Sequence, residues 1–132
     1  MRYETQQVCA GFNYILLQQM LSKSLKQKII GHLSPLNPRK IILFGSYAKG
    51  IPSHESDIDL LVITDDDFYP QTFKESMNIR LKFSKALFDF RKEYPVDLIV
   101  HTMPMYEKFV KLGSSLSKEI SLNGQILYER VD

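Results

Sequence analysis

Three short apolar runs stand out along this 132-residue chain, and each predicts a buried strand. The runs cover residues 41–44, 60–63 and 96–100, the last interrupted only by Asp97. They are too short for helices and rich in β-branched residues, which favour strands. A fourth run, residues 125–128, predicts an additional edge strand.

Apolar residues at helical spacing fill the segments between these runs. A stripe that begins at Leu21 predicts a helix, and we expect Gly31 and Pro35 to end it. Three further helices are expected, at residues 71–94, 103–112 and 114–122.

The longest of these helices carries more apolar surface than packing on one sheet requires. Its first stripe comprises Phe73, Met77, Leu81 and Phe88, and its second comprises Ile79, Phe83, Leu87 and Phe90. One stripe must face the sheet. The other either extends the core, covered by the arm at residues 1–19, or forms an interface with another protein, and we expect it to extend the core.

Acidic residues stand at the starts of two of the predicted strands. Side chains alternate along a strand, so Asp57 and Asp59 should point the same way, about 6 to 7 Å apart. Such a pair is costly unless a cation lies between the carboxylates, and hard oxygen ligands suit Mg²⁺ or Mn²⁺. For Asp97 to join them, the second and third strands must run parallel, with the intervening helix as the crossover. The first strand must then run antiparallel to the second.

A Gly-Ser pair ends the first strand. Gly45 allows the backbone to approach a ligand closely, and residues 46–49 can open a short helix. Free N–H groups at the start of a helix favour phosphate oxygens. The sequence therefore predicts phosphate binding beside the acidic residues.

The pattern Gly45-Ser46, ten residues, Asp57-Ile58-Asp59 and a third strand-borne acid, Asp97, resembles the nucleotidyltransferase superfamily that includes DNA polymerase beta. The chain is especially similar to its minimal nucleotidyltransferases, from about Leu21 to Tyr128. The resemblance implies an α+β fold, in which helices pack on a small mixed β-sheet. It also implies one nucleotidyltransferase domain at residues 20–132, preceded by an arm of uncertain origin at residues 1–19.

The resemblance also assigns roles to the motif residues of this chain. It implies that Asp57 and Asp59 bridge two Mg²⁺ ions, and that Asp97 holds the catalytic ion and helps to deprotonate the nucleophile. Gly45 and Ser46 would hold the phosphates of ATP, with Lys49 as electrostatic support.

Members of the family often have Arg-Ala-Arg-Gly after Gly-Ser, whereas this chain has Tyr47-Ala48-Lys49-Gly50. Lysine supplies a point charge there but not a bidentate fork.

Three hypotheses for the acceptor follow from the resemblance. The first is an antitoxin-type enzyme that transfers AMP to a hydroxyl of a partner protein, a HEPN-type toxin. The second is an enzyme acting on a small molecule such as an aminoglycoside, and the third is an antitoxin that neutralises its partner by contact alone. Small-molecule enzymes of this kind usually carry a second domain, for which 132 residues leave no room, so we expect a protein acceptor.

Composition limits the partners and the cellular compartment that we expect for this protein. The net charge of +2 is too small to indicate nucleic-acid binding by itself, and no apolar stretch is long enough to span a bilayer. A single cysteine, Cys9, excludes an internal disulfide, and no signal peptide is recognisable. We therefore expect a cytoplasmic protein.

Two further polar groups are weaker candidates for a site. Residues 65–67 are three consecutive aspartates, but they follow the second strand at the end opposite Asp57, so we expect a solvated turn and a helix cap. His54 lies in a polar loop and is expected to face solvent.

Overall fold

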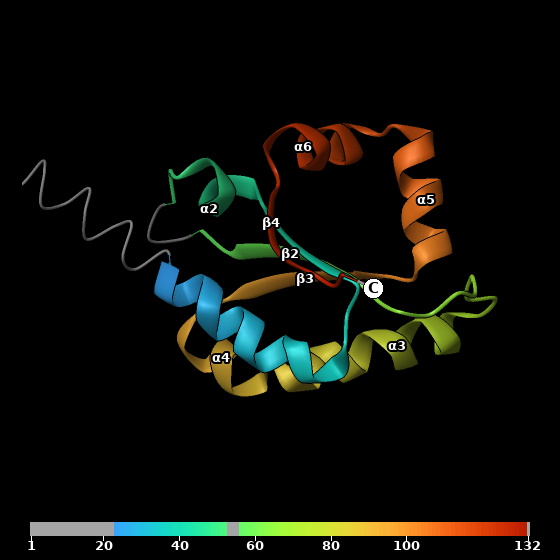
Figure 1. The fold of residues 1–132 in the computed structure, drawn as a ribbon, viewed down its shortest axis with the longest axis horizontal. Coiled ribbons are helices and arrows are strands. Elements are labelled where there is room, and N and C mark those ends of the chain that lie inside the picture. Colours follow the sequence, from blue (N-terminus) through green and yellow to red (C-terminus); the bar gives the residue numbers. More distant parts are fainter. Residues whose placement is uncertain (1–22, 53–55, 132) are drawn as a thin grey trace, which may run out of the picture.

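Four strands form one mixed sheet in the order β3-β2-β1-β4. A computed structural model describes residues 23–52 and 56–131 (Figure 1). The strands are β1 (Lys40–Phe44), β2 (Ile58–Ile63), β3 (Val96–His101) and β4 (Gln125–Glu129). The structure confirms the α+β class and all four predicted strands.

The strand directions are those that the acidic residues require. Strand β1 runs antiparallel to β2 and to β4, whereas β2 and β3 are parallel. The start of β2 therefore lies beside the start of β3 and beside the end of β1. This arrangement brings the predicted site residues to one end of the sheet.

One face of the sheet carries the larger apolar cluster. It is covered by the helix over residues 23–33, by α3 (Phe73–Ala86) and by α4 (Phe88–Glu93), which lie below the sheet in Figure 1. Leu60 and Val62 of β2 point to this side and are fully buried, as are Leu33 and Leu87 of the covering helices.

The opposite face carries a smaller cluster under α5 (Met103–Leu112) and α6 (Ser115–Asn123). Leu61 and Ile63 of β2 belong to it, and Ile120 of α6 packs on them. The short helix α2 (Gly45–Lys49) lies on the same side, at the opposite end from α5 (Figure 1). Both C-terminal helices and the short helix after β1 are confirmed.

The long helix predicted over residues 71–94 is interrupted. The backbone leaves helical geometry at Leu87, whose N–H is shared between the carbonyls of Phe83 and Ser84. No proline or glycine marks the break, and Leu87 is fully buried there. Phe90 lies beyond the break and is still buried in the core, where it contacts His32 and Tyr94.

The expectation that both apolar stripes of this segment are core was wrong. The second stripe is buried, but Phe73, Leu81 and Phe88 of the first are 80%, 40% and 65% exposed. Lys92 covers the ring of Phe88 from 4.9 Å, which shields part of it from water. The predicted arm at residues 1–19 lies outside the described residues, as does His54.

The end of the first helix also differs from its prediction. The helix continues through Gly31 to Leu33 and is followed by the 3-10 turn η1 (Ser34–Leu36), which contains Pro35. A lone glycine lowers helix stability without ending the helix. Proline ends it because the ring fits the first positions of a new turn but not a helix interior.

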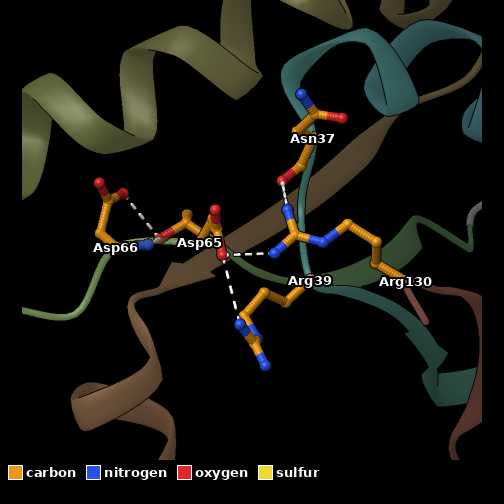
Figure 2. Close-up of polar contacts among 6 residues, drawn as sticks. Asn37, Arg39, Asp65, Asp66 and Arg130 are labelled. Carbon is orange, nitrogen blue, oxygen red and sulfur yellow. Dashed lines mark hydrogen bonds and ion pairs between the residues drawn. The ribbon is translucent and has the colours of Figure 1, made fainter. Parts of the chain in front are cut away.

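The aspartates at residues 65–67 lie at the far end of β2, as predicted, but none of them caps α3. Thr72 is the cap: its hydroxyl accepts from the N–H of Glu75, and the Glu75 carboxylate accepts from the N–H of Thr72. Asp65 instead accepts from Arg39 at 3.3 Å and from Arg130 at 2.6 Å (Figure 2).

No helix in the described part of the chain is long and apolar enough to cross a membrane.

Candidate active site

Asp59 and Asp97 lie side by side on the two parallel strands. Each is the second residue of its strand, and the register pairs them directly. Phe44, the last residue of β1, pairs with Asp59 on the other side. Asp57 immediately precedes β2, separated from Asp59 by the buried Ile58.

All three acids belong to the face of the sheet that carries α2, α5 and α6. Side chains alternate along strands, so Asp57 and Asp59 share a face with Leu61, and Asp97 shares it with Ile99. Both of these apolar residues belong to the smaller cluster. The three acids therefore lie on the same face of the sheet as the smaller cluster, at the N-terminal ends of β2 and β3.

The electrostatics of this end of the sheet disfavour three negative charges. The pKa of Asp59 is raised above its ordinary value, first because partial burial removes water from the carboxylate, and then because Asp97 and Asp57 repel its charge. Asp57 and Asp97 are themselves exposed. A cation at this position would remove the repulsion.

No basic side chain of residues 23–52 or 56–131 removes this repulsion. Among residues 23–52 and 56–131, no hydrogen bond or ion pair reaches the carboxylates of Asp57, Asp59 or Asp97. Within the same ranges no three acidic, histidine or cysteine side chains are already arranged around a common metal position. Metal binding by the three acids therefore remains a prediction, supported by their charge and oxygen chemistry.

Gly45 directly follows β1 and lies against the carboxylate of Asp59. Its φ of 74° lies in the left-handed region, which side chains disfavour. A Cβ atom at this position would also collide with the Oδ2 atom of Asp59. Only glycine lets the chain turn from β1 into α2 at this distance from the acid.

The other predicted phosphate-binding residues lie on α2. Ser46 is its second residue and is partly buried, and Lys49 is its last residue. The ammonium group of Lys49 forms an ion pair with Glu119 of α6 at 3.2 Å. The charge of Lys49 is therefore directed to a carboxylate of α6, at the end of α2 away from Gly45.

Two residues that fix α2 were missed in the sequence. Glu119 holds Lys49, and the side-chain amide of Gln125 donates to the carbonyl of Ala48 at 2.7 Å. Gln125 is 77 positions away from Ala48. No local pattern could indicate either contact, because both depend on the packing of α6 and β4 against α2.

The sequence model of the family described as Polymerase beta, Nucleotidyltransferase matches residues 27–132. The chain belongs to this family and is a nucleotidyltransferase. The matched region includes all the described strands and all six predicted site residues.

Relatives agree with this assignment. A protein of Methanocaldococcus jannaschii, named as a candidate protein adenylyltransferase, is 31% identical over 105 residues, which are 80% of this chain and 88% of that protein. The crystal structure of a candidate nucleotidyltransferase from Sulfolobus solfataricus is 19% identical, covers 87% of this chain and 86% of its own, and has a TM-score of 0.53. The latter likeness shows the shared fold.

A third similarity is to a chain in the structure of a tri-AMPylated Shewanella oneidensis HEPN toxin in complex with MNT antitoxin. It is 23% identical, covers 83% of this chain and 73% of that chain, and has a TM-score of 0.45.

Proposed function

We propose that the protein transfers AMP from ATP to a hydroxyl group of a partner protein, in the manner of a minimal nucleotidyltransferase antitoxin acting on a HEPN-type toxin. The observation that carries this proposal is the pairing of Asp59 with Asp97 beside Asp57, where partial burial and then the two neighbouring carboxylates raise the pKa of Asp59. Three acids at one end of the sheet, with no basic partner among the described residues, fit the binding of metal-complexed triphosphate.

The reaction is an in-line displacement. The acceptor oxygen attacks the α-phosphorus of ATP, a new oxygen–phosphorus bond forms, and the bond to the β-phosphate bridging oxygen breaks, releasing pyrophosphate. The proton of the acceptor hydroxyl passes to a carboxylate, for which Asp97 is the candidate because it is exposed at the start of an edge strand. The negative charge that builds up on the phosphate oxygens must be stabilised.

The roles of the remaining residues follow from their positions. Asp57, Asp59 and Asp97 would hold two Mg²⁺ ions, which would supply positive charge to the triphosphate. Gly45 gives the phosphates access to the backbone, and the Ser46 hydroxyl offers them a hydrogen bond. Lys49 would contribute its charge to the same region while it remains close to Glu119.

A protein acceptor is supported by the exposure of two of the acids and by the name of the 31% identical relative. Asp57 and Asp97 lie open to solvent, so a large acceptor can approach them. A macromolecule would supply the surface that positions the hydroxyl, which is a major part of the rate enhancement in transfer reactions.

The test is to mix the protein with ATP, Mg²⁺ and the product of a neighbouring HEPN-type gene, and to weigh the partner by intact mass spectrometry. We expect an adduct of one or more AMP groups on the partner and none with the Asp97→Asn variant. An inhibited but unmodified partner would indicate an antitoxin that acts by contact. An adduct on an aminoglycoside in place of the protein would assign the small-molecule activity.

A further inference from the structure

The short helix α2 is held at its C-terminal end by residues from the other end of the chain. The Ala48 carbonyl belongs to its last turn, where helical carbonyls lack partners within the helix. Gln125 supplies the missing donor through its side-chain amide at 2.7 Å, in a partly buried position. Ala48 itself is only 8% exposed, so an unpaired carbonyl there would be costly.

Gln125 is rigidly placed for this contact. It is the first residue of β4, and the sheet register pairs it with Leu43 of β1, two residues before α2 begins. Gly124 precedes it and cannot be replaced without disturbance, because a Cβ atom there would collide with the Ile120 carbonyl and press on Ile42. The turn from α6 into β4 therefore fixes the Gln125 side chain against α2.

A second contact acts on the same turn. Glu119 of α6 pairs with Lys49 at 3.2 Å, and both side chains are partly shielded, with exposures of 30% and 41%. At the other end of α2, Gly45 lies against the carboxylate of Asp59. Both ends of the five-residue helix are thus held in place. Gly45 at its start lies against Asp59, and its last turn is bound by Glu119 of α6 and Gln125 of β4.

We propose that Gln125 is a positioning residue for nucleotide transfer: through the Ala48 carbonyl it sets the place of Ser46 and Lys49 relative to Asp59. This inference rests on the proposed function, since it takes Ser46 and Lys49 as the phosphate-binding residues. The side-chain amide of Gln125 bonds to the Ala48 carbonyl and not to any of the three acids. Its effect should therefore appear in nucleotide binding more than in the chemical step.

The direct test is hydrogen exchange of the last turn of α2 in the absence of nucleotide. The amides of Gly50 and Ile51 donate to the carbonyls of Tyr47 and Ser46, so their exchange reports on this turn. The Gln125→Met variant keeps the side-chain length and removes the donor. We expect these amides to exchange about fivefold faster, as the loss of one hydrogen bond predicts.

The second measurement is steady-state nucleotide transfer by the same variant. We expect the KM for ATP to rise about fivefold while kcat changes less than about twofold, because uniform binding is lost. The matched control is Glu129→Gln, which removes a polar contact of the same strand, the ion pair with Lys40, at the end away from α2. It should leave both readouts unchanged. Gln125→Glu provides a second variant of the same length in case Gln125→Met does not fold.

The outcomes separate this inference from the proposed function. Unchanged exchange and an unchanged KM in folded Gln125 variants would overturn the inference alone. Faster exchange with an unchanged KM would also overturn it, and would show that α2 does not bind the phosphates. Failure of the unaltered protein to bind ATP with Mg²⁺ would refute the proposed function, and the positioning role with it.

Discussion

The two ends of strand β2 carry similar numbers of aspartates in opposite electrostatic settings. At its far end, Asp65 lies between Arg39 and Arg130, and Asp66 accepts from the Thr64 hydroxyl (Figure 2). The hydrogen bond from Arg130 and the charges of both arginines hold the pKa of Asp65 below its ordinary value. There the charge of Asp65 is balanced by two arginines of the protein itself.

At the beginning of β2, no described basic side chain balances the charges of the acids. The pKa of Asp59 is raised by burial and by its acidic neighbours, and no described side chain forms an ion pair with it. The difference teaches that a run of three aspartates is weaker evidence for a site than acids brought together from separate strands. In the first group, Asp65 joins the segments that follow β2 and β4 to the residue before β1, whereas the acids of the second group repel one another.

The largest expected difference between the two ends is their response to metal and nucleotide. With Mg²⁺ and a non-hydrolysable ATP analogue at about 100 times the dissociation constant, we expect the folded protein to gain about 2.7 kcal/mol of stability. Asp57→Asn and Asp59→Asn should lose most of this gain, and Asp65→Asn should keep it. Thermal unfolding with and without the ligands, supported by calorimetry, measures the effect. An undiminished gain in both variants of the β2 start would remove the metal assignment.

The second expected effect concerns the close packing of Gly45 on Asp59. Gly45→Ala should destabilise the protein by about 1 to 3 kcal/mol, because it combines a disfavoured φ with a collision against the carboxylate. Gly50→Ala is the matched control, since Gly50 has nearly the same φ, 77°, and nothing within 4 Å of a built Cβ atom. Urea unfolding of both variants isolates the contribution of the collision. Equal losses in the two variants would mean that Asp59 moves aside at no cost.

The sequence was sufficient to predict which end of the sheet carries the candidate residues, because its signals are local. Apolar runs of strand length, the spacing between Gly45-Ser46 and Asp57, and the alternation that pairs Asp57 with Asp59 are all visible within about 20 residues. The requirement that Asp97 join them then determined the strand directions, which the structure confirms.

The errors have identifiable physical causes. The break at Leu87 depends on the packing of the core and has no proline or glycine to mark it. The capping pair Thr72 and Glu75 is visible in the sequence, as threonine followed three residues later by glutamate, and it marks the start of α3 better than the aspartates do. The contacts of Gln125 and Glu119 with α2 join positions 70 or more residues apart and required the fold itself.

The smallest expected effect is a pair of stability changes with opposite signs. Without metal at pH 7, Asp59 is held in a setting that disfavours its charge, so Asp59→Asn should raise the melting temperature by a few degrees at most. Asp65→Asn should lower it by a smaller amount, because exposed ion pairs contribute little. Asp89→Asn, which removes an exposed pair with Lys92, serves as the neutral control.

The pH dependence distinguishes the two causes. The folded pKa of Asp59 is raised, so its penalty is complete above that pKa and disappears as the pH falls toward the ordinary value of 3.8. The folded pKa of Asp65 is lowered, so its contribution is complete above 3.8 and is lost as the pH falls through the folded value. Denaturant unfolding of the two variants and the unaltered protein, from about pH 7 down to about pH 3, should therefore show the Asp59→Asn advantage vanishing at a higher pH than the Asp65→Asn deficit. Shifts of the same sign for both variants at pH 7 would mean that the two ends of β2 do not differ in the way their neighbours predict.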